Sequence, residues 1–260
     1  MEALIVLFRR GLLYALLALL GAISLAWNLI ACVLFPLLPR PLGTTVGRAV
    51  ISRVYRRFWE SAQRLGMMRI DASALDRLAA EPGGLIVAAN HPTMIDALVL
   101  VAYLPRGVCI MKAGLMRNPF LGAGARLARY IRNDTGREMV RWSVDCLREG
   151  GQLVMFPEGT RTVRRPLNPF QPGIALIARR AGVPIQTVII ETDTPYLRKG
   201  WPIWRVPPFP IVIRLRLGER FLPDADHRAL LERLERHFVR EIAAPVPSSA
   251  PERVPETVSP

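Results

Sequence analysis

Cysteine, histidine and lysine are all scarce in this sequence of 260 residues. The three cysteines, Cys32, Cys109 and Cys146, lie far apart without a CxxC spacing, and the chain has only three histidines. These counts exclude a disulfide framework and argue against a structural zinc site, so no metal is expected. Cys109 falls in an apolar run and Cys146 in a helical pattern, which predicts core residues rather than nucleophiles.

Acidic residues are also few, with 21 against 35 basic residues and a net charge of +14. This balance favours anionic partners such as nucleic acid, acidic lipid heads or phosphate-bearing substrates. Only two of the basic residues are lysines, so a bias toward arginine accounts for part of the charge. A hydrophobic content of 51% excludes a disordered or collagen-like chain. The sequence contains neither GxxxxGK[ST] nor GxSxG, which weakens nucleotide-binding and serine-hydrolase interpretations.

The longest uncharged segment runs from Gly11 to Pro39. A helix needs about 20 such residues to cross a bilayer, and this segment is too long for a signal-peptide core. It predicts an N-terminal membrane helix, or a helical hairpin that breaks near Asn28 or Pro36, with residues 1–43 as the anchor. Arginines are denser after the segment than before it, which predicts a main domain on the cytoplasmic side. A buried core helix is the alternative.

Residues 44–66 form a second distinct segment, with apolar residues at three- and four-residue spacing and arginines between them. The pattern predicts a basic amphipathic helix. Such a helix either lies on an anionic bilayer or buries its apolar stripe in a core, and both interpretations remain open. At the other end, residues 244–260 are rich in proline and serine and are expected to be disordered.

Between these ends, residues 67–243 alternate short apolar runs with helical patterns. The predicted strands are Leu85–Ala89, Val108–Met111, Leu153–Phe156, Ile185–Ile190 and Ile211–Leu217. The predicted helices are Ile95–Tyr103, Phe120–Arg129, Arg137–Arg148, Gly173–Ala181 and Asp224–Ile242. This alternation predicts an α/β domain with a mixed, largely parallel sheet flanked by helices. Ligands of such sheets bind at the carboxyl ends of the strands, so the polar residues there are the candidates.

Asn90, His91 and Asp96 follow the first of these strands. A five-residue step does not align two side chains on a regular helix, but Pro92 and Thr93 indicate a turn after His91. The turn allows the Asp96 carboxylate to reach one ring nitrogen and fix the tautomer, while the other nitrogen acts as a general base. The alternative is a capping or core histidine beside a helix-start charge.

Two further polar clusters follow strands. Glu158, Gly159, Thr160 and Arg161 come after the strand that ends at Phe156, and offer an acceptor, a close backbone approach, a hydroxyl and a guanidinium. Arginine binds phosphate oxygens in a bidentate manner. Lys112 lies at the polar end of another strand and can supply a point charge to a phosphate. A solvated turn with an ion pair is the alternative.

Four segments together resemble the ordered blocks of the glycerolipid and lysophospholipid acyltransferase family. They are NHPTMID, KAGLMRNPFLG, FPEGTR and VPIQTV, and the resemblance covers residues 85–190. It implies that His91 is the general base on the acceptor hydroxyl and that Asp96 orients it. It further implies that Asn90 and nearby backbone N–H groups stabilise the oxyanion.

The resemblance also implies how substrates bind. Gly159, Arg161 and Lys112 would hold the acceptor's phosphate, Glu158 would shape that site, and Val183–Ile185 would line the acyl region. The implied reaction moves a fatty acyl group from acyl-CoA or acyl carrier protein to the hydroxyl of a lysophospholipid. With 1-acylglycerol 3-phosphate as acceptor, the product is phosphatidic acid. No cofactor, metal or nucleic-acid partner is implied. The expected location is a bacterial-type inner membrane, with the catalytic domain on its cytoplasmic side.

Two features depart from the family pattern. Thr187 stands where a second proline is common, and residues 192–210 form an aromatic, proline-rich segment outside the shared blocks. The segment suggests an interfacial loop or a wall specific to another acceptor, such as an aminolipid, a glycolipid or a polyene lipid. Two further functions remain open, a hydrolase with the same His–Asp pair and a non-enzymatic basic membrane module.

Overall fold

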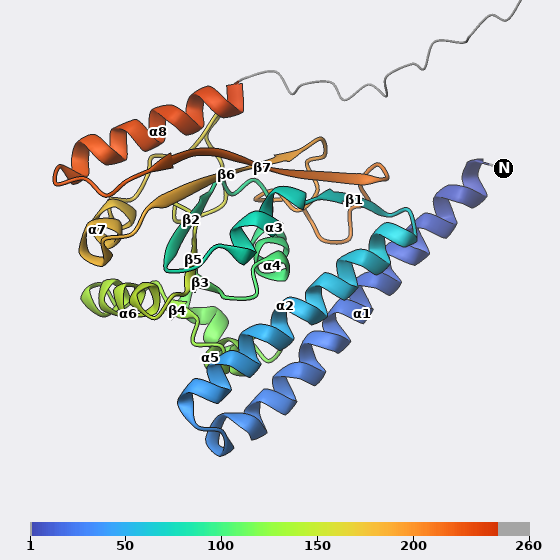
Figure 1. The fold of residues 1–260 in the computed structure, drawn as a ribbon. Coiled ribbons are helices and arrows are strands. Elements are labelled where there is room, and N and C mark those ends of the chain that lie inside the picture. The colour runs from blue at the N-terminus through green and yellow to red at the C-terminus, as the bar shows by residue number, and fades with distance from the viewer. Residues whose placement is uncertain (1, 244–260) are drawn as a thin grey trace, which may run out of the picture.

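The five apolar runs predicted as strands, together with two short strands that were not predicted, form a seven-stranded sheet in the computed structural model of the protein (Figure 1). The structure describes the backbone of residues 2–243 and the side chains of residues 4–243, so the prediction of disorder for 244–260 lies outside the described residues. The strands are β1 (Met68–Asp71), β2 (Leu85–Ala89), β3 (Gly107–Met111), β4 (Ile131–Arg132), β5 (Gln152–Met155), β6 (Ile185–Thr192) and β7 (Ile211–Phe221).

The sheet is mixed and largely parallel, as predicted. Its strand order is β1-β7-β6-β2-β5-β3-β4. Strands β2 to β6 run in one direction, whereas β7 is antiparallel to β6, and β1 pairs in parallel with β7. The carboxyl ends of β2, β3 and β5 therefore meet at one edge, where the three polar clusters of the sequence emerge.

Helices cover both faces of the sheet (Figure 1). They are α1 (Glu2–Leu37), α2 (Arg40–Arg64), α3 (Ser73–Ala80), α4 (Asp96–Tyr103), α5 (Gly122–Leu127), α6 (Arg137–Arg148), α7 (Gly173–Ala181) and α8 (His227–Ala243), with the 3₁₀ helix η1 (Ala113–Arg117). One apolar core joins the sheet to α1–α4, and a second joins it to α6–α8. Burial of these two faces is the main force that holds the layers together.

The N-terminal segment and the helix that follows it form an antiparallel pair of long helices, which reverses at the end of the uncharged run (Figure 1). Helix α1 is continuous through Asn28 and has Pro36 in its last turn, and the chain reverses at Leu38 and Pro39. Of the two predicted positions for a break, Asn28 is therefore wrong, whereas α1 does end one residue after Pro36. The Asn28 side chain instead accepts hydrogen bonds from the backbone N–H groups of Ala123 and Gly124, at 2.6 and 3.2 Å.

Helix α2 includes most of residues 44–66, the segment expected to form a basic amphipathic helix. One side of the helix lies in the core, where Ile51, Tyr55, Phe58 and Trp59 are buried. Of the apolar stripe expected from the sequence, Phe58 and Ala62 are buried, Val46, Val50 and Val54 are half-buried and Leu65 is exposed, so the buried side differs from the predicted one. Contact of the helix with a bilayer stays a prediction. Cys109 and Cys146 are also buried core residues, and burial raises the pKa of the Cys109 thiol to about 12, which disfavours a nucleophilic thiolate.

The elements that the sequence did not predict are short. Strands β1 and β4 have four and two residues, and α3 has eight. Strand β1 extends the sheet only because it pairs with β7, which is more than 130 residues away along the chain. A pattern of four residues carries too little periodicity to be separated from a loop.

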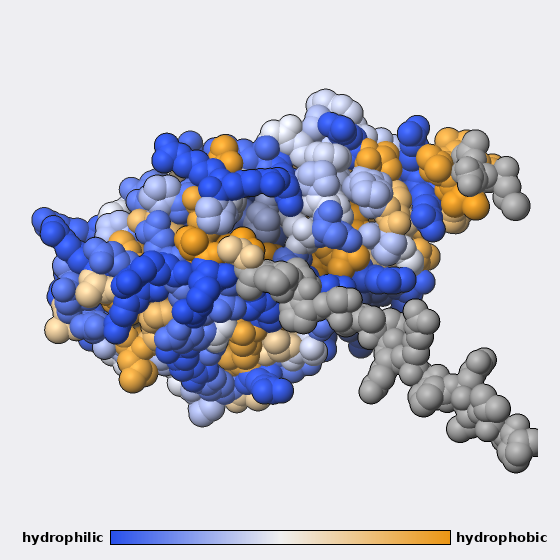
Figure 2. Space-filling model, turned by 90° about the horizontal axis from the view of Figure 1, so that it is seen from above, coloured by the Kyte–Doolittle hydropathy of each residue, from blue (hydrophilic) through white to orange (hydrophobic). Residues whose placement is uncertain are grey.

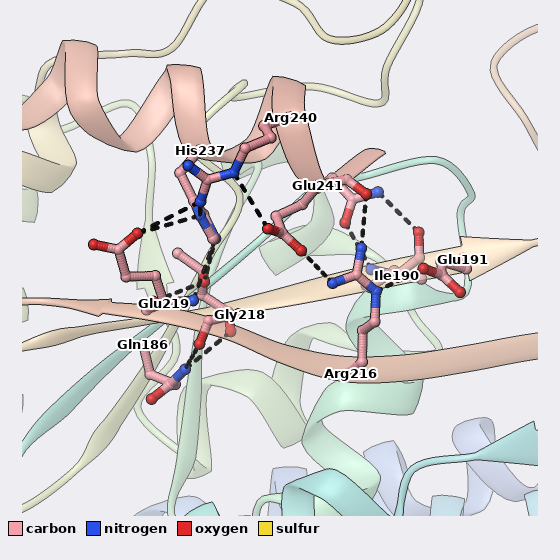
Figure 3. A network of polar contacts seen from close by, with 11 residues as sticks. Gln186, Ile190, Glu191, Arg216, Gly218, Glu219, His237, Arg240 and Glu241 are labelled. Atoms are coloured by element: carbon pink, nitrogen blue, oxygen red, sulfur yellow. Dashed lines mark hydrogen bonds and ion pairs between the residues drawn. The ribbon is translucent and has the colours of Figure 1, made fainter. Parts of the chain in front are cut away.

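A polar network lies on the face of the sheet covered by α8 (Figure 3). The buried His237 ring accepts a hydrogen bond at Nε2 from the backbone N–H of Glu219 and contacts the Thr187 hydroxyl at 3.0 Å. Glu219, Arg240 and Glu241 also surround the ring. Desolvation lowers the pKa of His237 below its ordinary value.

Acidification is therefore expected to destabilise the protein through His237. Because the folded-state pKa is lowered, the unfolded chain binds this proton first as the pH falls through about 6.5, and stability is lost below that value. Thermal unfolding between about pH 8 and pH 5.5 measures the effect. The His237→Gln variant should show a smaller fall in Tm over this window. An equal fall in both proteins would contradict the assignment.

Candidate active site

His91 and Asp96 meet at the carboxyl end of β2. The chain turns at Pro92 and Thr93, and Asp96 becomes the first residue of α4. Nδ1 of His91 lies 3.0 Å from Oδ2 of Asp96, which is 1% exposed. The predicted bend therefore brings the carboxylate to the ring. Thr93 donates two more hydrogen bonds to the same carboxylate, from its backbone N–H at 2.7 Å and from its hydroxyl.

The His91 ring is held on a second side by an aromatic contact. Phe156 stacks on it with ring centroids 4.0 Å apart and an interplanar angle of 17°. The side chain of His91 remains 17% exposed, whereas that of Asp96 is closed off. Because Nδ1 is bound to Asp96, Nε2 is the nitrogen left for a substrate proton. Phe156 is the end of a predicted strand and was not predicted to belong to the site.

Glu158 is a buried brace between two loops. It is 3% exposed and accepts hydrogen bonds from the backbone N–H of His91, the Thr162 hydroxyl and the backbone N–H of Asn168, at 3.1, 2.6 and 2.9 Å. Thr162 in turn donates its backbone N–H to the carbonyl of His91 at 2.8 Å. Glu158 therefore shapes the site, and the structure does not favour direct contact with a substrate.

Asn168 was not predicted, although it completes this brace. Its Oδ1 accepts from the backbone N–H groups of Val163 and Arg164, and its Nδ2 donates to the carbonyl of Arg161. The loop from Glu158 to Asn168 is thus tied both to itself and to the turn that carries His91. An asparagine ten residues after Glu158 has no pattern that would identify it from sequence alone.

The FPEGTR turn presents Gly159, Thr160 and Arg161 outward. The backbone N–H of Gly159 donates to the carbonyl of Phe156 at 3.0 Å, and Gly159 has φ +68°, a conformation that favours glycine. Gly159 is exposed, and Thr160 and Arg161 are half-buried. The turn therefore offers an open backbone surface beside a guanidinium.

Arg161 is oriented by the chain that follows β6. Its Nη1 donates to the carbonyls of Leu197 and Arg198, at 3.1 and 3.5 Å. Among the described residues, no acceptor is bonded to its Nε–Nη2 edge. This edge is the one that binds two oxygens of a phosphate or carboxylate.

Asn90 does not point to a substrate. The residue is 5% exposed, and its amide exchanges two hydrogen bonds with the backbone of Ile190, at 2.9 and 2.7 Å. The backbone N–H groups of His91, Thr93 and Met94 are bonded to Glu158, Asp96 and Leu197. The Asn90 amide therefore links β2 to β6, and the oxyanion role expected of Asn90 and of the N–H groups near the helix start stays a prediction.

Lys112 lies at the same edge of the sheet, directly after β3. Strand β5 lies between β3, which precedes Lys112, and β2, which precedes His91. Its side chain is exposed. The structure therefore puts Lys112 on the correct edge, and contact with the phosphate remains a prediction.

The fourth sequence block lies elsewhere. Val183, Pro184 and Ile185 precede or begin β6, at the edge opposite to His91, so the expected acyl-lining role is not supported. Thr187 is fully buried on the α8 side and donates to the carbonyl of Glu219. The threonine at this position, where the family commonly has proline, therefore contacts the polar network under α8 and not the candidate site.

Within residues 4–243, no three histidine, cysteine, aspartate or glutamate side chains are grouped to hold a metal ion. The same part of the chain contains one helix long and apolar enough to cross a membrane, Leu4–Leu37. The site thus consists of an imidazole–carboxylate pair and an arginine edge, which are joined through the carbonyl of Leu197.

Comparison with known proteins finds similarity to an acyltransferase family. Residues 69–191 match the family model "Acyltransferase". The chain is 32% identical over 136 residues to a 1-acyl-sn-glycerol-3-phosphate acyltransferase of Limnanthes alba, covering 50% of this chain and 48% of that protein. It is 23% identical over 190 residues to the Pseudomonas aeruginosa protein of the same name, covering 70% and 72%. The chain spans about half the length of the plant relatives it matches.

A solved structure supports the fold. The crystal structure of the 1-acyl-sn-glycerophosphate acyltransferase PlsC from Thermotoga maritima aligns with a TM-score of 0.69 at 20% identity, covering 90% of this chain and 95% of that one. The family match includes His91, Asp96 and Arg161 and the strands β2 and β5 that precede them. Residues 69–191, slightly less than half of the chain, are therefore similar to the acyltransferase family, and the relatives named 1-acyl-sn-glycerol-3-phosphate acyltransferase support this similarity.

Proposed function

We propose that the protein is an O-acyltransferase that moves a fatty acyl group from acyl-CoA or acyl carrier protein to the hydroxyl of a lysophospholipid. The observation that carries the proposal is the 3.0 Å contact of His91 with the buried Asp96, beside the free edge of Arg161. The relatives named 1-acyl-sn-glycerol-3-phosphate acyltransferase favour 1-acylglycerol 3-phosphate as the acceptor and phosphatidic acid as the product.

The chemistry follows from the tautomer of His91. Asp96 accepts a hydrogen bond from the Nδ1–H of His91, so Nε2 carries the lone pair and takes the proton of the acceptor hydroxyl. The acceptor oxygen attacks the thioester carbonyl and forms the new ester bond as the carbon–sulfur bond breaks. The departing thiolate then takes the proton back from Nε2. A thioester is already activated, so an acyl-enzyme is not required.

Arg161 supplies the charge that distinguishes a phosphate-bearing acceptor. Its Nε–Nη2 edge can bind two phosphate oxygens, and the open Gly159 turn allows the phosphate to approach the backbone. Lys112 would add a point charge from the neighbouring part of the same sheet edge. In this proposal the Thr160 hydroxyl also donates a hydrogen bond to the phosphate.

The Arg161→Ala variant is expected to raise the KM for the acceptor by roughly 10- to 100-fold, because hydrogen bonds to charged groups contribute about 1.5–3 kcal/mol. The KM for the acyl donor should change little. Steady-state kinetics with each substrate varied in turn provide the measurement. Arg164→Ala, which removes an exposed arginine three residues later, is the matched control. A rise in donor KM alone would contradict the assignment.

We also propose that the protein is attached to a bacterial-type inner membrane, with the catalytic domain on the cytoplasmic side. One side of α1 packs on the domain along much of its length, where Leu13, Leu16, Asn28 and Ala31 are buried. The remaining side exposes large apolar residues, which supports a helix lying in the lipid interface rather than one surrounded by lipid. Arginines in α2 favour the cytoplasmic orientation.

One observation favours a second candidate, the same transfer to a different lipid hydroxyl. Residues 193–210 follow the family match and bind Arg161 through Leu197 and Arg198. A matrix of acyl donors and lipid acceptors, read by lipid mass spectrometry, separates the candidates. Acylated product that forms only with phosphate-bearing acceptors supports the first. Acyl release without any acceptor would instead indicate a hydrolase.

A further inference from the structure

The segment between β6 and β7, residues 193–210, contacts the turn after His91, the side chain of Arg161 and helix α1. It begins at the carboxyl end of β6. Because β6 is parallel to β2, this end lies at the same edge of the sheet as His91. Tyr196 and Leu197 are buried in the core that also contains Leu13 and Leu16 of α1. The segment therefore packs between the candidate site and the apolar N-terminal helix.

Leu197 makes the connection to the site. Its carbonyl accepts hydrogen bonds from the backbone N–H of Met94 and from Nη1 of Arg161, both at 3.1 Å. Leu197 is 3% exposed and has φ +60°, a left-handed conformation that is unusual for a branched residue. A single carbonyl thus bridges the turn after His91 and the arginine proposed to bind phosphate. The position of Arg161 depends on how this segment is held.

Trp204 makes the connection to α1. Its carbonyl accepts a hydrogen bond from the Tyr14 hydroxyl at 2.7 Å, whereas its side chain is 71% exposed. The neighbouring Ile203 is 46% exposed. On α1, Leu7 lies two turns before Tyr14 on the same side of the helix and is also exposed. Figure 2 shows hydrophobic side chains at the right-hand end of the molecule, where α1 begins.

Positively charged side chains lie near the exposed Ile203 and Trp204 in the same segment. Arg198, Lys199 and Arg205 lie in the same segment, and the Arg205 guanidinium stacks over Trp201 at 4.6 Å. Tryptophan beside cations is typical of protein surfaces at a membrane interface, where the ring lies at headgroup level and the cations bind acidic lipid heads. The surface is continuous with the apolar helix through the Tyr14–Trp204 hydrogen bond.

We propose that residues 193–210 contact an anionic bilayer, with Ile203 and Trp204 inserted beside α1, and that this contact positions Arg161 through Leu197. The lipid surface would thereby align the phosphate-binding edge with an acceptor that comes from the bilayer. The first half of the proposal stands on the exposed surface, and the second half rests on the proposed function.

Fluorescence quenching tests the bilayer contact. The 260-residue chain is reconstituted with vesicles of phosphatidylglycerol and phosphatidylcholine, with and without brominated acyl chains. The brominated lipid is expected to quench the wild-type protein more than the Trp204→Phe variant. The matched control adds Leu222→Trp to Trp204→Phe, because Leu222 is equally exposed at 70% but lies beyond the far end of β7. Equal quenching of wild type and Trp204→Phe would overturn the proposal.

Kinetics test whether the bilayer contact helps the enzyme to bind its acceptor. The double variant Ile203→Ser/Trp204→Ser should raise the KM for a long-chain acceptor in vesicles about tenfold, because two apolar side chains no longer enter the lipid. A short-chain acceptor dispersed as monomers should be affected much less. Equal effects on both acceptors would overturn the role of the bilayer. If no acceptor is acylated by any form of the protein, the proposed function fails, whereas the quenching result still decides the bilayer contact.

Discussion

Replacement of His91 by alanine is expected to lower kcat by about 10²–10⁴-fold, the usual contribution of a positioned general base. The variant keeps Asp96, Thr93 and the Glu158 brace, because Glu158 bonds the backbone N–H of His91 and not its ring. Substrate binding should therefore persist while proton transfer is lost. Initial rates of acylated product formation at saturating donor and acceptor measure the effect.

The chain provides a matched control for this variant. His227 lies at the start of α8, far along the sequence from the site, and His227→Ala should retain wild-type turnover. The Tm of His91→Ala should stay close to that of the wild type, which separates loss of chemistry from loss of fold. A His91→Ala protein that remains folded and turns over at the wild-type rate would refute the role of His91 as the base.

Replacement of Asp96 by asparagine is expected to reduce kcat by a similar order, about 10²–10⁴-fold, for a different reason. The carboxylate accepts from the His91 ring and twice from Thr93, so all of its contacts need an acceptor. Asparagine has one acceptor oxygen and one NH₂ donor. An NH₂ group in place of Oδ2 opposes both the Thr93 N–H and the Nδ1 proton, which favours the wrong tautomer of His91. An NH₂ group in place of Oδ1 faces the Thr93 hydroxyl, which can turn to accept, and the neutral amide then lacks the charge that stabilises the imidazolium.

Two measurements together separate orientation from folding. The rate reports the loss of function, and nitrogen NMR of the imidazole reports whether the proton has moved from Nδ1 to Nε2. Asp134→Asn is the control, because Asp134 pairs with Arg132 at the surface, with half-exposed side chains. An Asp96→Asn protein with the wild-type tautomer and the wild-type rate would contradict the orienting role.

The sequence predicted the parts of the site that depend on local chemistry. The turn at Pro92 and Thr93 explains how His91 reaches Asp96, and the apolar runs predicted the strands that bring Arg161 to the same edge. Helix α6 and helix α7 begin and end where the periodicity predicted. These features are encoded within a few residues, so a local pattern can identify them.

The bracing roles could not be predicted in this way. Asn90 and Glu158 look like ligand-binding residues because they are polar and follow strands, yet their partners are Ile190 and Asn168, which only the folded chain brings near. The left-handed conformation of Leu197 has no signal in the sequence, because a leucine gives no indication of a positive φ. Long-range packing decided these positions.

Product stoichiometry tests the central claim most directly. The purified protein is given acyl-CoA with 1-acylglycerol 3-phosphate or with the analogue that lacks the free hydroxyl, and released thiol is measured beside phosphatidic acid. With a hydroxyl-bearing acceptor, one thiol should appear for each phosphatidic acid formed, and both should vanish in His91→Ala and with the analogue. Thiol release that continues without a hydroxyl acceptor, or phosphatidic acid that still forms at the wild-type rate in His91→Ala, would contradict the account.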